Sequence, residues 1–158
     1  MLNKKIAFIG SGAMGEAMIA GLLRKGLAHS DNLLTADVHA GRVEDLRERY
    51  GTQPFTDNRL AAEGADLVVL SVKPQRLTEV LKALRGAIAP HALVLSIVAG
   101  AKIAKISNGL GHDAIVRSMP NTPAQIGQGI TVWMPSPAVS EPQRSEEHTS
   151  ELQSPNTI

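Results

Sequence analysis

The chain has 158 residues, of which 43% are hydrophobic, and this length suits one domain, or one domain with a fragment of another. Because only 3% of the residues are aromatic, the core has to be aliphatic and rich in alanine, as in α/β proteins. A net charge of +1 without a basic block argues against nucleic acid and anionic membranes as partners, and the absence of cysteine excludes disulfides and thiol catalysis.

The N-terminal stretch combines an apolar run, a glycine motif and a helical period. Residues 6–9 predict a short buried strand, and apolar residues at positions 14, 18 and 22 predict a helix over about residues 13–25. Between them lies the sequence Gly10-Ser11-Gly12-Ala13-Met14-Gly15, the GxGxxG pattern of a dinucleotide-binding βαβ unit. Gly10 permits the tight turn, Gly12 lets a pyrophosphate approach the backbone, and Gly15 lets helix and strand pack closely. We therefore expect this motif to bind the pyrophosphate at the N-terminus of the helix.

Residues 33–38 predict a second strand, and its end bears on the choice of nucleotide. Asp37 lies 22 residues after Gly15, near the place where such folds put an acid that binds the ribose 2′-OH of NAD. His39 and Arg42 follow, and a cation there would instead hold the 2′-phosphate of NADP. The alternative is that Asp37 merely ends a strand. The residues therefore leave the choice between NADH and NADPH open.

Strand and helix patterns then alternate as far as residue 134. Helices are predicted over residues 43–50, after Asp57-Asn58, over 77–84 and over 103–110, and strands over 67–72, 93–98, 114–117 and 129–134. The charged residues 44–49 are interpreted as a solvated helix face. This order predicts an α/β fold with a doubly wound, mainly parallel sheet of the Rossmann type. Ligands bind beyond the carboxyl ends of such strands, which places residues 10–15, 37–39, 72–74, 98–100 and 119–123 on one rim.

Four strand-end segments resemble those of the pyrroline-5-carboxylate reductases, the family that carries out the last step of proline biosynthesis. The segments are Ile9-Gly-Ser-Gly-Ala-Met-Gly15, Ser71-Val-Lys-Pro74, Ser96-Ile-Val-Ala-Gly100 and Met119-Pro-Asn-Thr-Pro123, in this order. The last segment is the most specific, because generic Rossmann domains lack it. The resemblance covers about residues 4–134.

This resemblance implies that a hydride passes from NADPH or NADH to the imine carbon of 1-pyrroline-5-carboxylate, giving L-proline, without a metal. Carried over to this sequence, it implies cofactor contacts by Gly10, Ser11, Gly12, Ala13, Met14, Gly15, Asn58, Val72, Lys73, Pro74, Val98, Ala99 and Gly100, beside Asp37 and His39. Asn121 and Thr122 are implied to contact the small-molecule substrate. The family often has a small or hydroxyl residue at strand two, so Asp37-Val38-His39 speaks against a strict NADPH preference. From the residues alone, Lys73 also fits a solvated turn and Asn121-Thr122 a rigid turn.

The family continues into a helical domain that forms a homo-oligomer and closes the substrate pocket, and the resemblance places the catalytic residues there. In this chain residues 144–158 have almost no apolar content and predict a disordered tail. Arg144–Ser154 resembles the in-frame translation of a sequencing-library adapter, so we expect a non-native tail. We expect residues 1–143 to form a dinucleotide-binding domain that is monomeric and reduces the imine weakly or not at all.

Two other functions remain open at this stage. One is another Rossmann oxidoreductase, of the β-hydroxyacid dehydrogenase type or the deazaflavin-dependent NADP reductase type, in which we would not expect the segment 119–123. The other is a non-enzymatic nucleotide-binding module, because the sequence has no convincing acid–base pair. No apolar run reaches the length of a membrane span, so a soluble, cytoplasmic protein is expected.

Overall fold

The computed structural model describes residues 3–118 and 133–135. Within these ranges a single sheet contains the strands β1 (Ile6–Ile9), β2 (Leu33–Ala36), β3 (Gln53–Phe55), β4 (Leu67–Leu70), β5 (Leu93–Ser96), β6 (Ile115–Ser118) and β7 (Trp133–Pro135). Their order across the sheet is β3-β2-β1-β4-β5-β6-β7. All neighbours are parallel except β7, which runs antiparallel to β6. The predicted mainly parallel sheet is therefore confirmed.

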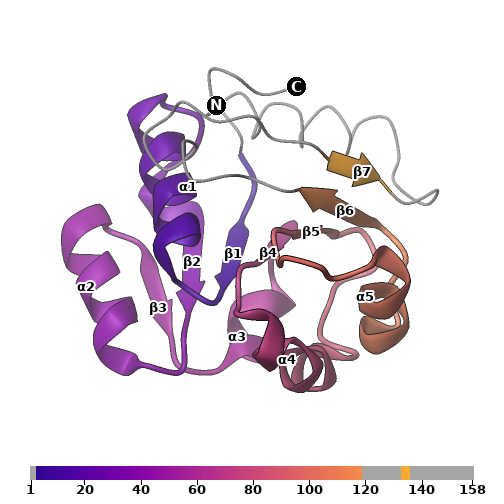
Figure 1. The fold of residues 1–158 in the computed structure, drawn as a ribbon. Coiled ribbons are helices and arrows are strands. Elements are labelled where there is room, and N and C mark those ends of the chain that lie inside the picture. The colour runs from indigo at the N-terminus through magenta and orange to yellow at the C-terminus, as the bar shows by residue number, and fades with distance from the viewer. Residues whose placement is uncertain (1–2, 119–132, 136–158) are drawn as a thin grey trace.

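Helices connect the parallel strands and cover both faces of the sheet (Figure 1). They are α1 (Ala13–Arg24), α2 (Ala40–Tyr50), α3 (Asn58–Glu63), α4 (Leu77–Leu84) and α5 (Ile103–Leu110). One buried core joins the sheet to α1 and α2, and a second joins its other face to α3, α4 and α5. Because both faces of β1, β2, β4 and β5 are covered, these strands are buried at every position.

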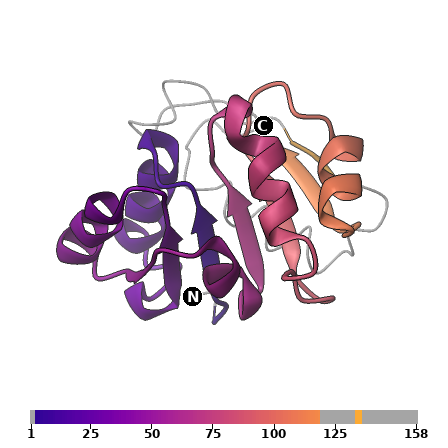
Figure 2. The ribbon, with the colours of Figure 1, turned by 90° about the horizontal axis from the view of Figure 1, so that it is seen from below.

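The chain adds β2 and then β3 on one side of β1, and afterwards crosses back to add β4 on the other side of β1. Strands β1 to β3 extend to one side and β4 to β7 to the other, so the N-terminal and C-terminal halves lie side by side (Figure 2). This reversal is the doubly wound topology, and its carboxyl edge is where such sheets bind ligands.

Two details differ from the sequence-based expectation, and a third prediction lies partly outside the described residues. The strands predicted over 33–38, 67–72 and 93–98 each end two residues earlier, because the last residues turn away from the sheet at its carboxyl edge. Strand β3 was not predicted, since it has three residues and contains Pro54, which only an edge position tolerates. Strand β7 overlaps the predicted strand 129–134, of which residues 129–132 lie outside the described ranges, as do the segments 119–123 and 144–158.

Gly10 follows β1 directly, and its backbone lies close to the segment after β4. Its φ is +85°, and a Cβ placed there would lie 2.8 Å from Val72 Cγ1 and 2.9 Å from the Ser71 carbonyl atoms. The Gly10 amide also donates to the Ala36 carbonyl at 2.9 Å. A side chain at this position would therefore meet both conformational strain and a backbone clash.

A Gly10→Ala variant should lose about 2–4 kcal/mol of unfolding free energy in urea titrations, from left-handed strain together with overpacking. Gly86→Ala is the matched control, because Gly86 has a φ of +82° but open space within 4 Å of a Cβ. It should lose only about 1 kcal/mol, the strain alone. Equal losses in the two variants would contradict the close contact.

Asp66 lies at the opposite edge of the sheet, next to the start of β4. Its carboxylate accepts the Lys5 amide at 2.9 Å and lies 2.9 Å from His91 Nε2. Partial burial acts to raise the pKa of Asp66, but the Lys5 amide, His91 and the Lys4 charge together hold it below its usual value. The contact joins β1, β4 and the turn before β5.

The pKa of Asp66 is lower in the folded chain than in the unfolded chain, where it is 3.8. The charged carboxylate therefore stabilises the fold at pH values above 3.8, and this stabilisation is lost as the pH falls through the folded-state pKa. Asp66→Asn should therefore lower Tm at about pH 5, and its difference from the parent chain should shrink towards about pH 3. Asp31→Asn, at an exposed position, is the control. A difference in Tm that stays constant over this range would overturn the assignment.

Candidate functional site

A pocket opens at the carboxyl ends of β1, β2 and β4, the edge at which the topology reverses. It brings together eight of the predicted cofactor residues: Gly10, Ser11, Gly12, Asp37, His39, Asn58, Val72 and Lys73. Four further lining residues were not assigned a contact from the sequence: Val38, Ser71, Arg76 and Val80. Arg76 follows Lys73-Pro74 by one turn, so extending the predicted rim by that turn would have found it.

The remaining predicted cofactor residues do not line this pocket. Ala13, Met14 and Gly15 form the first turn of α1, directly behind the glycine turn. Pro74 lies beside the pocket, next to Lys73, whereas Val98, Ala99 and Gly100 follow β5. The two predicted substrate residues, Asn121 and Thr122, lie outside the described ranges. These assignments remain predictions.

The glycine turn presents open backbone to the pocket. A Cβ at Gly12 would meet no atom within 4 Å, and Gly12 is the N-cap of α1 without a side-chain hydrogen bond to the helix. A Cβ at Gly15 would lie 3.2 Å from Ser71 Oγ and 3.3 Å from the Gly10 carbonyl, so that glycine serves the packing of α1. The space in front of Gly12 and the unsatisfied amides of a helix N-terminus fit a pyrophosphate.

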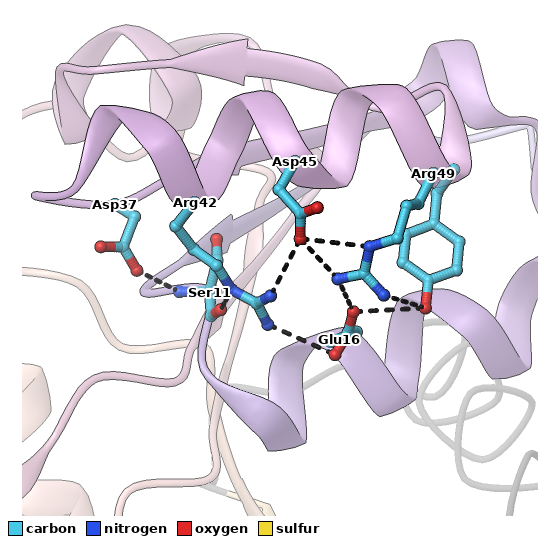
Figure 3. A network of polar contacts seen from close by, with 7 residues as sticks. Ser11, Glu16, Asp37, Arg42, Asp45 and Arg49 are labelled. Atoms are coloured by element: carbon cyan, nitrogen blue, oxygen red, sulfur yellow. Dashed lines mark hydrogen bonds and ion pairs between the residues drawn. The ribbon is translucent and has the colours of Figure 1, made fainter.

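Asp37 holds the glycine turn against the end of β2. One carboxylate oxygen accepts the Ser11 amide at 2.9 Å (Figure 3). The other accepts the His39 amide at 2.9 Å. The hydroxyl of the buried Ser11 donates to the Ala36 carbonyl at 3.3 Å. Each carboxylate oxygen of Asp37 retains a second lone pair, so it can still accept a ribose hydroxyl from the pocket.

Arg42 lies on the other side of the same turn. Its Nε donates to the Ser11 carbonyl at 2.5 Å, and its two terminal nitrogens lie 3.5 Å from Asp45 and 3.4 Å from Glu16. Arg49 pairs with the same two acids, at 2.7 Å from Asp45 (Figure 3). We call Glu16, Arg42, Asp45 and Arg49 the α1–α2 network. Arg49 is thus engaged with Glu16 of α1, and Asp45 is held by Arg42 and Arg49 of its own helix, which corrects the interpretation of residues 44–49 as a purely solvated face.

Tyr50 adds a neutral hydroxyl to this network. Its hydroxyl donates to Glu16 at 3.3 Å. Partial burial, with the neighbouring Glu16 carboxylate, raises the pKa of Tyr50, so the phenol stays protonated and remains a donor near neutral pH.

The opposite wall of the pocket carries two cations after β4. Lys73 is exposed, and Arg76 pairs with Glu79 at 3.6 Å. Within residues 3–118 and 133–135 no group of three His, Cys, Asp or Glu side chains is placed to hold a metal ion. In the same ranges no helix combines the length and the apolar character needed to cross a bilayer.

Comparison with known proteins connects this site to one class of enzyme. The model of the family described as "NADP oxidoreductase coenzyme F420-dependent" matches residues 5–100. A pyrroline-5-carboxylate reductase of Vibrio alginolyticus is 41% identical over 132 residues, 83% of this chain and 48% of that protein. The reductase of a Synechocystis strain is 36% identical over 130 residues, 82% of this chain and 48% of that protein.

A solved pyrroline-5-carboxylate reductase from Coxiella burnetii has the same fold, with a TM-score of 0.94 and 28% identity over 99% of this chain and 58% of that one. The chain therefore spans about half the length of the curated relatives it matches, their N-terminal part. It belongs to the NADP oxidoreductase family named above, and within it the chain is similar to the N-terminal part of pyrroline-5-carboxylate reductases.

Proposed function

We propose that this chain is the nucleotide-binding half of a cytoplasmic pyrroline-5-carboxylate reductase, which reduces 1-pyrroline-5-carboxylate to L-proline. The nucleotide is NADPH or NADH, since the chain belongs to a family of NADP oxidoreductases. The observation that carries the proposal is the open backbone at Gly12, in front of the uncapped N-terminus of α1 and beside Asp37. Curated relatives named pyrroline-5-carboxylate reductase support the choice of reaction.

Each wall of the pocket has a separate task in this proposal. The amides of Gly12 to Met14 bind the pyrophosphate, because the Ser11 amide is held by Asp37, and Asp37, His39 and Asn58 lie on the adenosine side. Residues 72–74 and 98–100 are proposed to lie on the nicotinamide side. Of these, Val72 and Lys73 line the pocket, so that Lys73 places a positive charge near the reacting ring. The nicotinamide supplies the hydride, while the chain supplies binding, orientation and electrostatics.

The substrate side of the proposal extends beyond the described residues. Asn121 and Thr122 are proposed to contact the cyclic imine. The half of the relatives' length that this chain does not span is proposed to close the pocket, to contribute the catalytic groups and to form the homo-oligomer. The 158-residue chain is proposed to be monomeric.

A second candidate is an oxidoreductase that exchanges a hydride between NADP and coenzyme F420, as the description of the matching family indicates. The family model ends at residue 100, before the segment Met119–Pro123 on which the resemblance to the imine reductases depends. The names of the curated relatives favour the imine as substrate.

Replacing Gly12 by valine should weaken nucleotide binding at least about tenfold without unfolding the chain, because the side chain would occupy the space of the pyrophosphate. Calorimetric titration with NADH and NADPH measures the affinity, and thermal unfolding should give an unchanged Tm. Gly64→Val is the control, since Gly64 also has open space around a Cβ and lies at the C-terminus of α3. Unimpaired binding by Gly12→Val would contradict the proposed pyrophosphate site.

The purified 158-residue chain should bind the nucleotide yet oxidise it at least about 100-fold more slowly than a complete reductase when the imine is added, because closure and orientation of the substrate are missing. The Vibrio alginolyticus enzyme, assayed by loss of absorbance of the reduced nucleotide, provides the reference rate. Turnover close to that of the reference would show that this half suffices and would overturn the division of tasks.

A further inference from the structure

We propose that the α1–α2 network makes this nucleotide site prefer NADH to NADPH, and that Glu16 is the positioning residue that sets this preference. The inference rests on the proposed nucleotide-binding function. It concerns the 2′ position of the adenosine ribose, at which NADPH carries a phosphate and NADH a hydroxyl.

Asp37 presents a fixed negative charge to that position. Both of its oxygens are held by backbone amides, those of Ser11 and His39, each at 2.9 Å, so the carboxylate cannot rotate away without breaking a hydrogen bond. It can accept a hydrogen bond from a 2′-hydroxyl, whereas a doubly charged 2′-phosphate would be placed against a like charge. Asp37 therefore favours NADH unless a nearby cation compensates.

Arg42 lies across the glycine turn from Asp37, and both side chains contact the backbone of Ser11 (Figure 3). Its guanidinium group is already engaged on three sides: Nε with the Ser11 carbonyl and the terminal nitrogens with Asp45 and Glu16. The side chain is 27% exposed. Charge-assisted contacts of this kind hold the guanidinium group towards α1 and away from a phosphate in the pocket.

The charge of the α1–α2 network balances. Its two arginines face its two acids, and Arg49 contacts the same Glu16 and Asp45 that Arg42 does. With Asp37 included, this side of the pocket has three carboxylates against two guanidinium groups, and His39 beside them is exposed. On the opposite wall Arg76 pairs with Glu79, and Lys73 is assigned to the nicotinamide side. The adenosine side therefore offers no surplus positive charge to a 2′-phosphate.

Glu16 controls this balance because it contacts both arginines from the first turn of α1. Its side chain is 23% exposed, so its charge is only partly screened by water. Without that charge, Asp45 is the remaining acidic partner of Arg42. Asp45 lies 2.7 Å from Arg49 but 3.5 Å from Arg42, so Arg49 binds it more closely. The count on this side then falls to two carboxylates, Asp37 and Asp45, against two guanidinium groups, so the excess negative charge that opposes a 2′-phosphate is removed.

The test compares dissociation constants for NADH and NADPH in the 158-residue chain and its variants. The parent chain should bind NADH at least about tenfold more tightly. Glu16→Gln should reduce that ratio about threefold to tenfold, mainly by tightening NADPH binding. Glu79→Gln is the matched control: it also removes one negative charge beside a pocket arginine, Arg76, and it should leave the ratio unchanged.

Asp45→Asn provides a second variant of the network and should reduce the ratio in the same direction, even if Glu16→Gln unfolds. Equal or tighter binding of NADPH by the parent chain would overturn the inference, as would an unchanged ratio in both network variants. An equal shift in Glu79→Gln would also overturn it, because the effect would then follow net charge. If neither nucleotide binds the folded parent chain, the proposed function itself fails, which separates that outcome from a failure of the inference.

Discussion

The close contact between the glycine turn and the segment after β4 fixes the geometry on which the pocket depends. The Gly10 amide donates to the Ala36 carbonyl and the Ser71 amide to the Ile9 carbonyl, both at 2.9 Å, so the ends of β1, β2 and β4 are joined through backbone groups. The Ser71 hydroxyl adds a hydrogen bond to the Gly10 carbonyl. Because the Gly10 Cα lies directly against this segment, only glycine brings the two walls of the pocket to this separation.

Asp37 couples the stability of this arrangement to its binding chemistry. Its carboxylate satisfies the Ser11 amide, a group that would otherwise lie unpaired in a turn between buried strands. The same carboxylate forms part of the pocket wall, facing the place where a ribose is proposed to bind. Recognition of a ribose alone would not require a hydrogen bond to the glycine turn. Support of the turn alone would require only a hydrogen-bond acceptor, not a charged group. Asp37 performs both tasks because the turn and the ligand share one edge of the sheet.

Much of the fold could be predicted because its signals are local. Apolar runs predicted β1, β4 and β5, and the helical period predicted α4 and α5. A helix was expected after Asp57-Asn58, and Asp57 caps α3 by accepting the Arg59 amide at 2.8 Å. The ends of the strands were predicted too late, because apolar residues such as Val72 continue the pattern beyond the last paired residue in order to line the pocket. Strand β3 has too few residues to give a periodic signal, and its pairing with β2 becomes evident only in the assembled sheet.

The α1–α2 network shows why part of the site is invisible in the sequence. Glu16 and Arg42 belong to different helices, and the sequence gives no sign that they meet; on α2 the pattern of alternating charges predicts only a helix exposed to water. In the structure the same pattern has two functions. Glu44 and Arg47 pair along the helix on its exposed side, whereas Arg42 and Arg49 reach Glu16 of α1. The Arg42 and Glu16 side chains, 27% and 23% exposed, are more shielded from solvent than those of Arg47 and Glu44, 50% and 48% exposed, so water screens their charges less. In the proposed nucleotide preference, Glu16 therefore need not touch the ligand, because it acts through its contact with Arg42, which lies against the glycine turn.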